Sequence, residues 1–121
     1  MLKTLIVEKN EGFRDSLIKF LGEQFSTMAF EMASTGKEAL EKFPLFCPQL
    51  VFVDIHLPGG NGLQLARRIR EKNAGTVIVM LADQDGPEYR LAANKVGANH
   101  FVSKGGASVD ALIGLVGAIV E

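Results

Sequence analysis

The feature that most constrains the fold is a strict alternation of short apolar runs with segments of helical periodicity. The apolar runs lie at 5–7, 28–32, 50–53, 77–81 and 100–102. After each run, apolar residues recur every three or four positions, as they do along one face of a helix. This alternation predicts a parallel sheet whose strands are joined by right-handed crossovers, with helices on both faces.

Helix start and stop signals support this interpretation. Asn10 is placed to cap the first helix, and Thr35 with Glu38 forms a capping box before the second. Pro87 suits the first turn of the fourth helix, which Gly97 would close. The third and fifth helices are expected over about 62–72 and 109–120.

The strand order follows from which runs are apolar throughout. The runs at 5–7, 50–53 and 77–81 are almost wholly apolar, as central strands covered on both faces must be. The run at 28–32 alternates and carries Glu31, which suits an edge strand. We therefore predict an α/β fold of the flavodoxin-like, doubly wound type, with five parallel strands in the order 2-1-3-4-5 and five helices. Residues 1–121 are expected to form one domain, with any output domain outside this chain.

Composition narrows the possible functions. The net charge is −1 and positive residues do not form runs, so direct nucleic-acid binding is not expected. No apolar segment approaches the roughly 20 residues of a membrane span. The one cysteine, Cys47, cannot form an intrachain disulfide, and we expect it to be a small, buried and unreactive residue. These features favour a cytoplasmic protein.

Charged residues follow the predicted strands where a site should form. In open α/β sheets, sites lie beyond the carboxyl ends of the strands, next to the point where the strand order reverses. Glu8 and Lys9 follow the first strand, Asp54 the third, Leu81 ends the fourth and Lys104 follows the fifth. Two carboxylates and two ammonium groups are therefore expected to meet at one edge of the sheet.

At these positions the chain resembles the receiver domain of two-component response regulators over essentially its whole length. The matching residues are Asp54 with Leu57-Pro58 and Gly62 in DIHLPGGNG, Glu8 after the first strand, and Lys104 in HFVSKG. The resemblance implies a signalling module rather than an enzyme, with Asp54 as the phosphoacceptor. It also implies a histidine kinase or phosphotransfer protein as phosphodonor.

The resemblance assigns further roles around Asp54. Glu8, Asp54 and the backbone carbonyl of His56 would hold Mg²⁺, and Lys104 would pair with the phosphoryl group. Charge on the equatorial oxygens must be neutralised during in-line phosphoryl transfer, and a divalent ion with a lysine does this. Output would pass through protein contacts or homodimerisation on the fourth helix, fifth strand and fifth helix.

Lys9 departs from the family pattern, in which a second acidic residue ligates the metal at this position. An ammonium about 4 Å from the metal would cost roughly 4 kcal/mol per unit charge at an effective dielectric near 20, and about twice that against a divalent ion. The flexible side chain could swing into water, so this is an upper bound. We therefore expect Mg²⁺ binding to be weak or absent, with Lys9 partly replacing the ion.

Leu81 is the second departure, because the family has a Ser or Thr there that contacts the phosphoryl group. Its loss removes a charge-assisted hydrogen bond worth about 1.5–3 kcal/mol. Phe101, three residues before Lys104, keeps the aromatic ring of the family's switch without a hydroxyl. We expect weak phosphorylation of Asp54 and switching that is weakly coupled to it.

Simpler interpretations remain open at this stage. Asp54 could cap the turn before the next helix, Glu8 and Lys9 could be solvated, and Lys104 could cap a carbonyl. The glycines at 59, 60 and 62 are expected in a turn rather than in a phosphate-binding loop. At the level of the whole domain, the alternatives are a degenerate receiver that acts as a phosphorylation-independent interaction or dimerisation module, and a small flavodoxin-like enzyme or flavin carrier. The last is disfavoured because no Ser/Thr/Gly-rich loop follows the first strand.

The last helix carries a separate signal. Besides its core stripe it has small and apolar residues, and Leu91 also lies off the core stripe of its own helix. The residues of this expected apolar surface are Leu91, Ala111, Gly114, Leu115 and Ala118.

Overall fold

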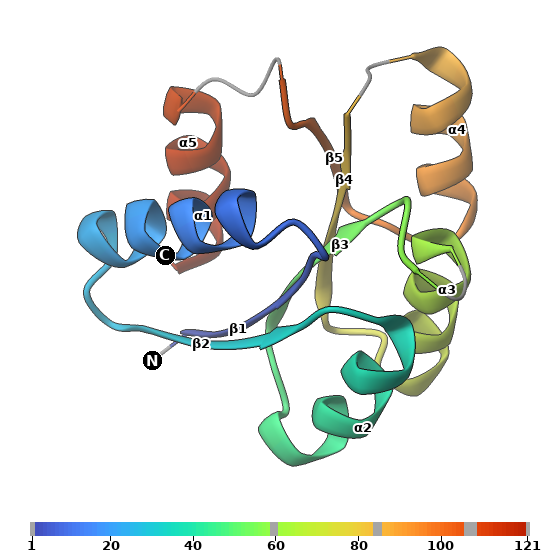
Figure 1. Cartoon of the computed structure of the whole chain (residues 1–121), viewed down its shortest axis with the longest axis horizontal. Helices are drawn as coiled ribbons and strands as arrows, with labels where there is room; N and C mark the ends of the chain where they lie inside the picture. Colours follow the sequence, from blue (N-terminus) through green and yellow to red (C-terminus); the bar gives the residue numbers. More distant parts are fainter. Residues whose placement is uncertain (1, 59–60, 84–85, 106–108, 121) are drawn as a thin grey trace.

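A computed structural model describes residues 2–58, 61–83, 86–105 and 109–120, and Figure 1 shows its ribbon. The strands are β1 Leu2–Val7, β2 Met28–Ala33, β3 Leu50–Asp54, β4 Val77–Ala82 and β5 His100–Ser103. The helices are α1 Glu11–Gln24, α2 Gly36–Phe46, α3 Gly62–Lys72, α4 Pro87–Lys95 and α5 Val109–Val120. Strands and helices therefore alternate as the sequence predicts.

The sheet is parallel, and its order β2-β1-β3-β4-β5 confirms the predicted order. Val7 at the end of β1 pairs with Ala33 on one side and Val53 on the other. The residues that follow β1 and β3 are consequently neighbours. β2 is an edge strand, as its alternating pattern and Glu31 indicate.

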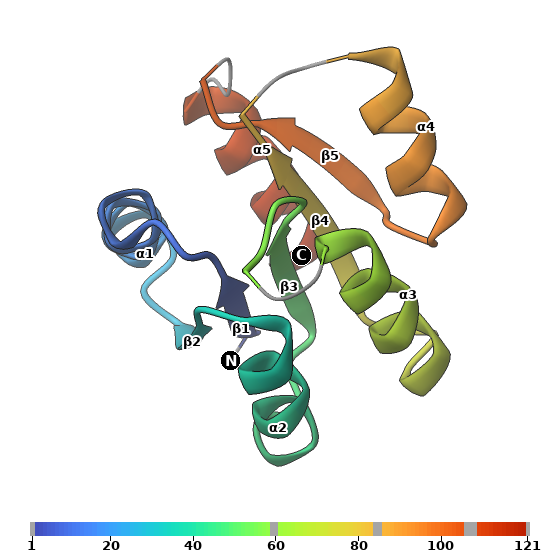
Figure 2. The same cartoon turned by 45° about the vertical axis from the view of Figure 1, so that its right-hand side comes forward.

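The helices form two layers, with α1 and α5 on one face of the sheet and α2, α3 and α4 on the other (Figures 1 and 2). Successive residues of a central strand serve opposite layers, because side chains alternate across a strand. Leu5 and Val7 pack in the core beneath α2, α3 and α4, whereas Ile6 packs in the core beneath α1 and α5. This double burial explains why the central strands are apolar throughout.

The helix caps follow the predicted residues. Asn10 accepts a hydrogen bond from the Phe13 N–H, and Thr35 accepts one from the Glu38 N–H. The Glu38 carboxylate in turn accepts from the Ser34 N–H, one residue before the cap. These contacts fix where α1 and α2 begin, and therefore how the preceding strand ends are held.

Some details differ from the sequence interpretation. Cys47 is exposed rather than buried, because it ends α2 in the left-handed conformation with φ of 53°. A residue that ends a helix and turns the chain in this way lies at the surface. β1 also begins three residues earlier than expected, at Leu2. The turn glycines at 59 and 60 lie outside the described residues.

No helix in the described part of the chain is both long and apolar enough to cross a membrane.

Candidate functional site

Three separate strands bring Glu8, Asp54 and Lys104 together at the carboxyl edge of the sheet. The Lys104 ammonium forms an ion pair with Glu8 Oε1 at 2.5 Å and another with Asp54 Oδ2 at 3.2 Å. These residues are 46 or more positions apart in sequence, so only the strand order places them in contact. We call these three residues the acidic pocket.

Main-chain hydrogen bonds fix the strand ends that carry the pocket. The Glu8 N–H donates to the carbonyl of Ala33, and the Lys104 N–H donates to the carbonyl of Ala82. Glu8 therefore extends the pairing of β1 with β2, and Lys104 extends the pairing of β5 with β4. The main chain at both residues is therefore held by the sheet and not by a loop alone.

Glu8 is wholly buried, which is unusual for a carboxylate. Its Oε2 atom accepts a hydrogen bond from the Asn10 N–H, and its Oε1 atom faces Lys104 without a partner in hydrogen-bonding geometry among the described residues. The alternative of a solvated charge after the first strand is therefore wrong for Glu8. A buried carboxylate needs a paired cation, and Lys104 provides it.

Asp54 has two different partners, one for each carboxylate oxygen. Oδ1 accepts a hydrogen bond from the His56 N–H at 3.0 Å, and Oδ2 faces Lys104. Asp54 thus does cap the turn after β3, as the simpler interpretation suggested, but its second oxygen also belongs to the acidic pocket. Asp54 is only 2% exposed, so little of its carboxylate is accessible to solvent or to a phosphodonor.

Gly62 is required by the close approach of α3 to Asp54. A Cβ atom at position 62 would lie 1.9 Å from the carbonyl oxygen of Asp54, closer than any real contact. The Gly62 N–H also donates to the carbonyl of Ile55, which fastens the start of α3 to the end of β3. The glycine in the sequence DIHLPGGNG therefore sets the shape of the loop behind Asp54.

The titration behaviour of the pocket follows from burial and charge. Burial raises the pKa of Glu8 above its usual value, although Lys104 and the Asn10 N–H act in the opposite direction. Burial also acts to lower the pKa of Lys104, but the adjacent carboxylates of Glu8 and Asp54 outweigh it and the pKa is raised. Lys104 is therefore held in its charged form between the two carboxylates.

Lys9 lies outside this arrangement. Its side chain is exposed and makes no ion pair within the described residues. The cation between the carboxylates is Lys104, and the pocket of two carboxylates and one ammonium keeps one net negative charge. The flexible stem of Lys9 allows its ammonium to remain in water, which is the cheaper arrangement for a charge.

Leu81 lies on β4, the strand next to that of Asp54, and Phe101 lies on β5, one strand further. Leu81 is paired with Asp54 across β3 and β4, and its side chain is buried in the core beneath α1 and α5. A leucine side chain has no hydrogen-bond donor, so this position offers none to Asp54. Phe101, on β5, is half-buried against the opposite core, and the Arg90 guanidinium lies 4.9 Å from its ring centroid.

Two residues contact the pocket that sequence reasoning did not place there. The Phe13 ring centroid lies 5.1 Å from Lys104 Nζ, within the range of a cation–π interaction. Asp83 Oδ1 lies 3.8 Å from the same ammonium and is largely exposed. Asp83 was recognisable as a loop charge after the fourth strand, whereas Phe13 had no signal beyond its place on the apolar stripe of its helix.

The acidic pocket offers few ligands for Mg²⁺. This ion prefers six oxygen ligands, usually including several waters. The ligands that the family resemblance implies are Glu8, Asp54 and the main-chain carbonyl of His56, while position 9 carries an ammonium instead of a further carboxylate. Both carboxylates already contact Lys104, so an ion would have to compete with it. No group of three or more His, Cys, Asp or Glu side chains suited to a metal occurs in the described regions.

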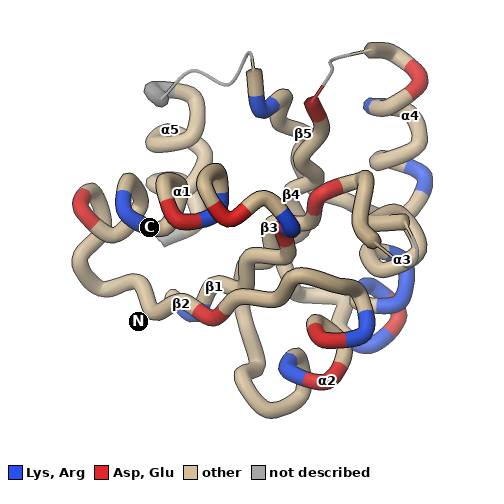
Figure 3. The backbone as a smooth tube through the Cα atoms, in the orientation of Figure 1, with Lys and Arg blue, Asp and Glu red and all other residues tan. Residues whose placement is uncertain are grey.

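A second feature lies away from this pocket, on α4, β5 and α5. Leu91 on α4 is 57% exposed, and Ala111, Gly114 and Ala118 on α5 are exposed. The sequence of α5 contains one charged residue, Asp110, and the coloured part of the helix in Figure 3 shows no Lys, Arg, Asp or Glu. We call this set the α4–β5–α5 surface; Leu115, expected to belong to it, instead packs partly against the core.

Comparison with known proteins identifies the fold and the family. The model of the response regulator receiver domain matches residues 4–115. The chemotaxis protein CheY of Halobacterium salinarum is 31% identical over 102 residues, which are 84% of this chain and 83% of that protein. A protein-glutamate methylesterase/protein-glutamine glutaminase of Geobacillus kaustophilus is 34% identical over 104 residues. This chain spans only 30% of that protein, so the similarity concerns one part of it.

Solved structures agree closely with the fold. The signal receiver domain of a DNA-binding response regulator from Colwellia psychrerythraea superposes with a TM-score of 0.93 at 20% identity, covering 99% of this chain and 98% of that one. The non-phosphorylated HemR receiver domain from Leptospira biflexa has a TM-score of 0.87 at 27% identity, covering 100% and 95%. With a sheet of the predicted order and a family model that matches nearly its whole length, the chain belongs to the response regulator receiver domain family.

Proposed function

We propose that this receiver domain accepts a phosphoryl group on Asp54, slowly, from a histidine kinase or phosphotransfer protein in the cytoplasm. The observation that supports this most is the convergence of Glu8, Asp54 and Lys104 at one edge of the sheet. Structural pairing alone would not require a buried carboxylate on one strand, a second on the next and a lysine between them.

The proposed reaction is an in-line displacement at phosphorus. A carboxylate oxygen of Asp54 attacks, a P–O bond to Asp54 forms, and the bond from phosphorus to the donor's leaving atom breaks. Lys104 is already within 3.2 Å of Asp54 Oδ2, so its ammonium can pair with the negative oxygens of the transferring group. A bound Mg²⁺, held by Glu8, Asp54 and the His56 carbonyl, would supply further charge neutralisation.

Two residues are expected to make this reaction slow. Lys9 supplies no carboxylate at the position where the family has a metal ligand, which weakens Mg²⁺ binding. Leu81 supplies no hydrogen bond to the phosphoryl group, and it is buried, so water cannot replace the missing donor there. The acidic pocket is therefore present, while Mg²⁺ binding is weakened and one hydrogen bond to the phosphoryl group is lost.

The proposed output is a protein contact on the α4–β5–α5 surface. Phe101 lies on β5, and the Arg90 guanidinium of α4 lies 4.9 Å from its ring centroid. A movement of the Phe101 ring would therefore change its contact with Arg90 on α4. Because Leu81 has no hydroxyl to respond to the phosphoryl group, the coupling between Asp54 and this surface is expected to be weak.

The test is incubation with acetyl phosphate and Mg²⁺, followed by intact-mass measurement over time. We expect a slowly accumulating adduct of one phosphoryl group in the wild type and none in Asp54→Asn. Asp83→Asn is the matched control, since Asp83 also contacts Lys104 but is exposed, and it should retain the adduct. An adduct that persists in Asp54→Asn would contradict the proposal.

The second candidate is a degenerate receiver that works as a phosphorylation-independent interaction or dimerisation module. It is favoured by the same two positions, Lys9 and Leu81, and by the Lys104 ammonium, which already forms an ion pair with each of the two carboxylates. Beryllofluoride with Mg²⁺ distinguishes the candidates through amide chemical shifts. Large shifts around Asp54 support an active receiver, and an unchanged spectrum supports the degenerate one. Large shifts on α4 would contradict the weak coupling proposed above.

A further inference from the structure

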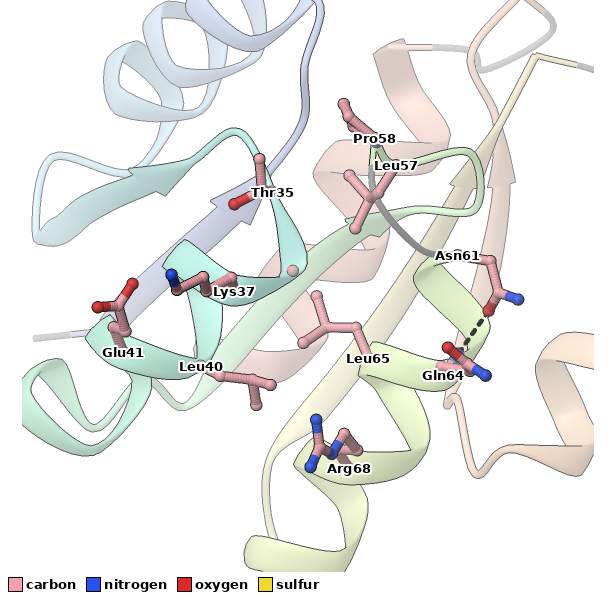
Figure 4. Close-up of a pocket in the computed structure, with 11 residues that line it drawn as sticks. Thr35, Lys37, Leu40, Glu41, Leu57, Pro58, Asn61, Gln64, Leu65 and Arg68 are labelled. Atoms are coloured by element: carbon pink, nitrogen blue, oxygen red, sulfur yellow. Dashed lines mark hydrogen bonds between the residues drawn. The ribbon is translucent and has the colours of Figure 1, made fainter.

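A groove of about 720 Å³ lies between α2 and α3, away from the acidic pocket (Figure 4). Its inner wall is apolar and is formed by Leu40 of α2, Leu65 of α3 and Leu57 of the loop after β3. Figure 4 shows Leu40 and Leu65 pointing toward one another from the two helices. None of the three residues of the acidic pocket contributes to it.

The size and lining of the groove suit a small organic ligand. Ligand pockets usually enclose about 300–1,000 Å³ and combine apolar walls with a few polar groups. Leu57 and Leu65 are buried at the base, and Leu40 is half-buried at the side. Docking of a partner helix would instead need apolar anchors repeated over several turns, and three leucines cover only a short length.

The polar groups of the groove favour an anion. Arg68 of α3 and Lys37 of α2 line it, together with the single carboxylate of Glu41, which leaves one net positive charge. The side chains of Arg68 and Lys37 are exposed, and neither makes an ion pair within the described ranges. The first turn of α2, at Gly36, also lines the groove, and a helix N-terminus adds partial positive charge.

We propose that the groove binds an amphipathic organic anion, with its apolar body over Leu40 and Leu65 and one anionic head beside Arg68 and Lys37. The inference goes beyond the proposed function, because it involves no chemistry at Asp54 and holds whether or not Asp54 accepts phosphate. Leu57 belongs to the loop that follows Asp54, so a ligand in the groove would contact that loop.

The test uses two fluorescent probes that share an apolar ring system and differ in charge. One is 8-anilino-1-naphthalenesulfonate, which has a sulfonate, and the other is the uncharged N-phenyl-1-naphthylamine. We expect the sulfonate probe to bind at a single saturable site and to shift the amide resonances of Leu40, Leu65 and Arg68. The uncharged probe should bind at least about tenfold more weakly, because it lacks the charge-assisted contact.

Charge-reversal variants separate this groove from general attraction to the protein. Arg68→Glu should weaken the sulfonate probe by about tenfold or more and leave the uncharged probe unchanged. Arg67→Glu is the matched control, because Arg67 is the exposed neighbour on α3 and does not line the groove. It should change neither affinity by more than about twofold, since exposed charges are screened.

A second pair of variants tests whether the probes need the open volume of the groove between α2 and α3. A Cβ atom at Gly36 would meet nothing within 4 Å, so the backbone there admits a side chain, and Gly36→Trp adds bulk at the groove. It should weaken both probes, whereas Gly114→Trp, at an equally open glycine on α5, should weaken neither. Absence of saturable binding, amide shifts centred on α5, or equal affinities in Arg68→Glu and Arg67→Glu would overturn the proposal.

Discussion

Lys104 is the residue on which the acidic pocket depends. It is mostly buried and faces Glu8 and Asp54 at once, with the Phe13 ring on another side. Removing one partner of a buried ion pair usually costs about 3–5 kcal/mol, because the remaining charge stays buried without compensation. Lys104 therefore contributes both to the stability of the sheet edge and to the proposed chemistry, and the two roles must be separated by experiment.

The pKa of Glu8 provides the first prediction. Burial raises it above 4.5 in the folded protein, while Lys104 lowers it. Between 4.5 and the folded value, the folded state binds the extra proton, so the free energy of unfolding should fall as the pH rises through this window. Carbon-detected NMR titration of the Glu8 carboxyl, with denaturant unfolding at each pH, measures both.

The variant Lys104→Met serves as the comparison for this titration. It should raise the pKa of Glu8 further, because it removes the cation that stabilises the carboxylate. A Glu8 pKa at or below 4.5 in the wild type would contradict the burial argument.

Lys9 provides a prediction about the metal. Lys9→Asp replaces an exposed ammonium beside Glu8 with a carboxylate, adding a ligand and removing a repulsive charge. We expect the dissociation constant for Mg²⁺ to fall by at least about tenfold, as measured by isothermal titration calorimetry. Lys19→Asp, an equal change of charge at an exposed site on α1, should have little effect. A wild-type affinity in the sub-millimolar range that is lost in Asp54→Asn would show that Mg²⁺ binding is not weak.

Among the elements, the start of α3 is the most constrained. Gly62 lies so close to the carbonyl of Asp54 that no side chain fits, and its N–H fastens the helix to β3. Gly36 occupies the corresponding first position of α2, where a Cβ atom would have open space. A side chain is therefore excluded at the first position of α3 but admitted at the first position of α2.

We expect Gly62→Ala to destabilise the protein by about 2–4 kcal/mol, because the loop after Asp54 must move to admit a methyl group. Gly36→Ala should instead stabilise it by about 0.4–1 kcal/mol, because alanine restricts the unfolded chain and fits the helix. Urea unfolding of both variants measures the difference. Equal effects would show that the close approach at Gly62 is not maintained in solution.

The sequence predicted the elements well because their signals are local. Alternating or wholly apolar runs fixed the strands and their order, and Asn10 and Thr35 marked two helix starts through caps that the structure contains. The exposed Cys47 was mispredicted, because its burial depends on the left-handed end of α2. The contact of Phe13 with Lys104 was also beyond sequence reasoning, since it requires knowing how α1 lies over the sheet.

The sequence predicted those site residues whose positions are determined by the ends of the strands. Glu8, Asp54 and Lys104 follow strands whose order the pattern revealed, and the structure brings them together. The side-chain direction of Lys9 was not fixed by its position, because a flexible residue directly after a strand can extend to water. Its interpretation as a partial replacement for the ion stays a prediction. The cation that the structure places between the two carboxylates is Lys104.

At the scale of the whole molecule, the charged pocket and the α4–β5–α5 surface are separate features on one scaffold. Leu91, on α4, is the large apolar residue of that surface, with 57% of the residue exposed. We expect the protein to self-associate there, and Leu91→Lys to weaken association by about tenfold or more, because burying a leucine is worth about 1.5–3 kcal/mol. Sedimentation equilibrium measures this.

The matched control is Leu45→Lys, since Leu45 is 87% exposed on α2, away from this surface. It should leave the association constant unchanged. Equal weakening by both variants would indicate nonspecific association of apolar side chains, and a monomer at every concentration would exclude self-association.

The most direct test of the account restores both altered positions at once. The double variant Lys9→Asp with Leu81→Thr should form the Asp54 adduct with acetyl phosphate at least about tenfold faster than the wild type, in an Mg²⁺-dependent manner. Leu81→Val with Lys9→Asp is the control for lost core volume, and circular dichroism confirms that each variant is folded. The account predicts that the acceleration is largest where the hydroxyl and the carboxylate are both present, and smaller in the valine control. A folded double variant that forms no adduct, or forms one at the wild-type rate, would contradict it.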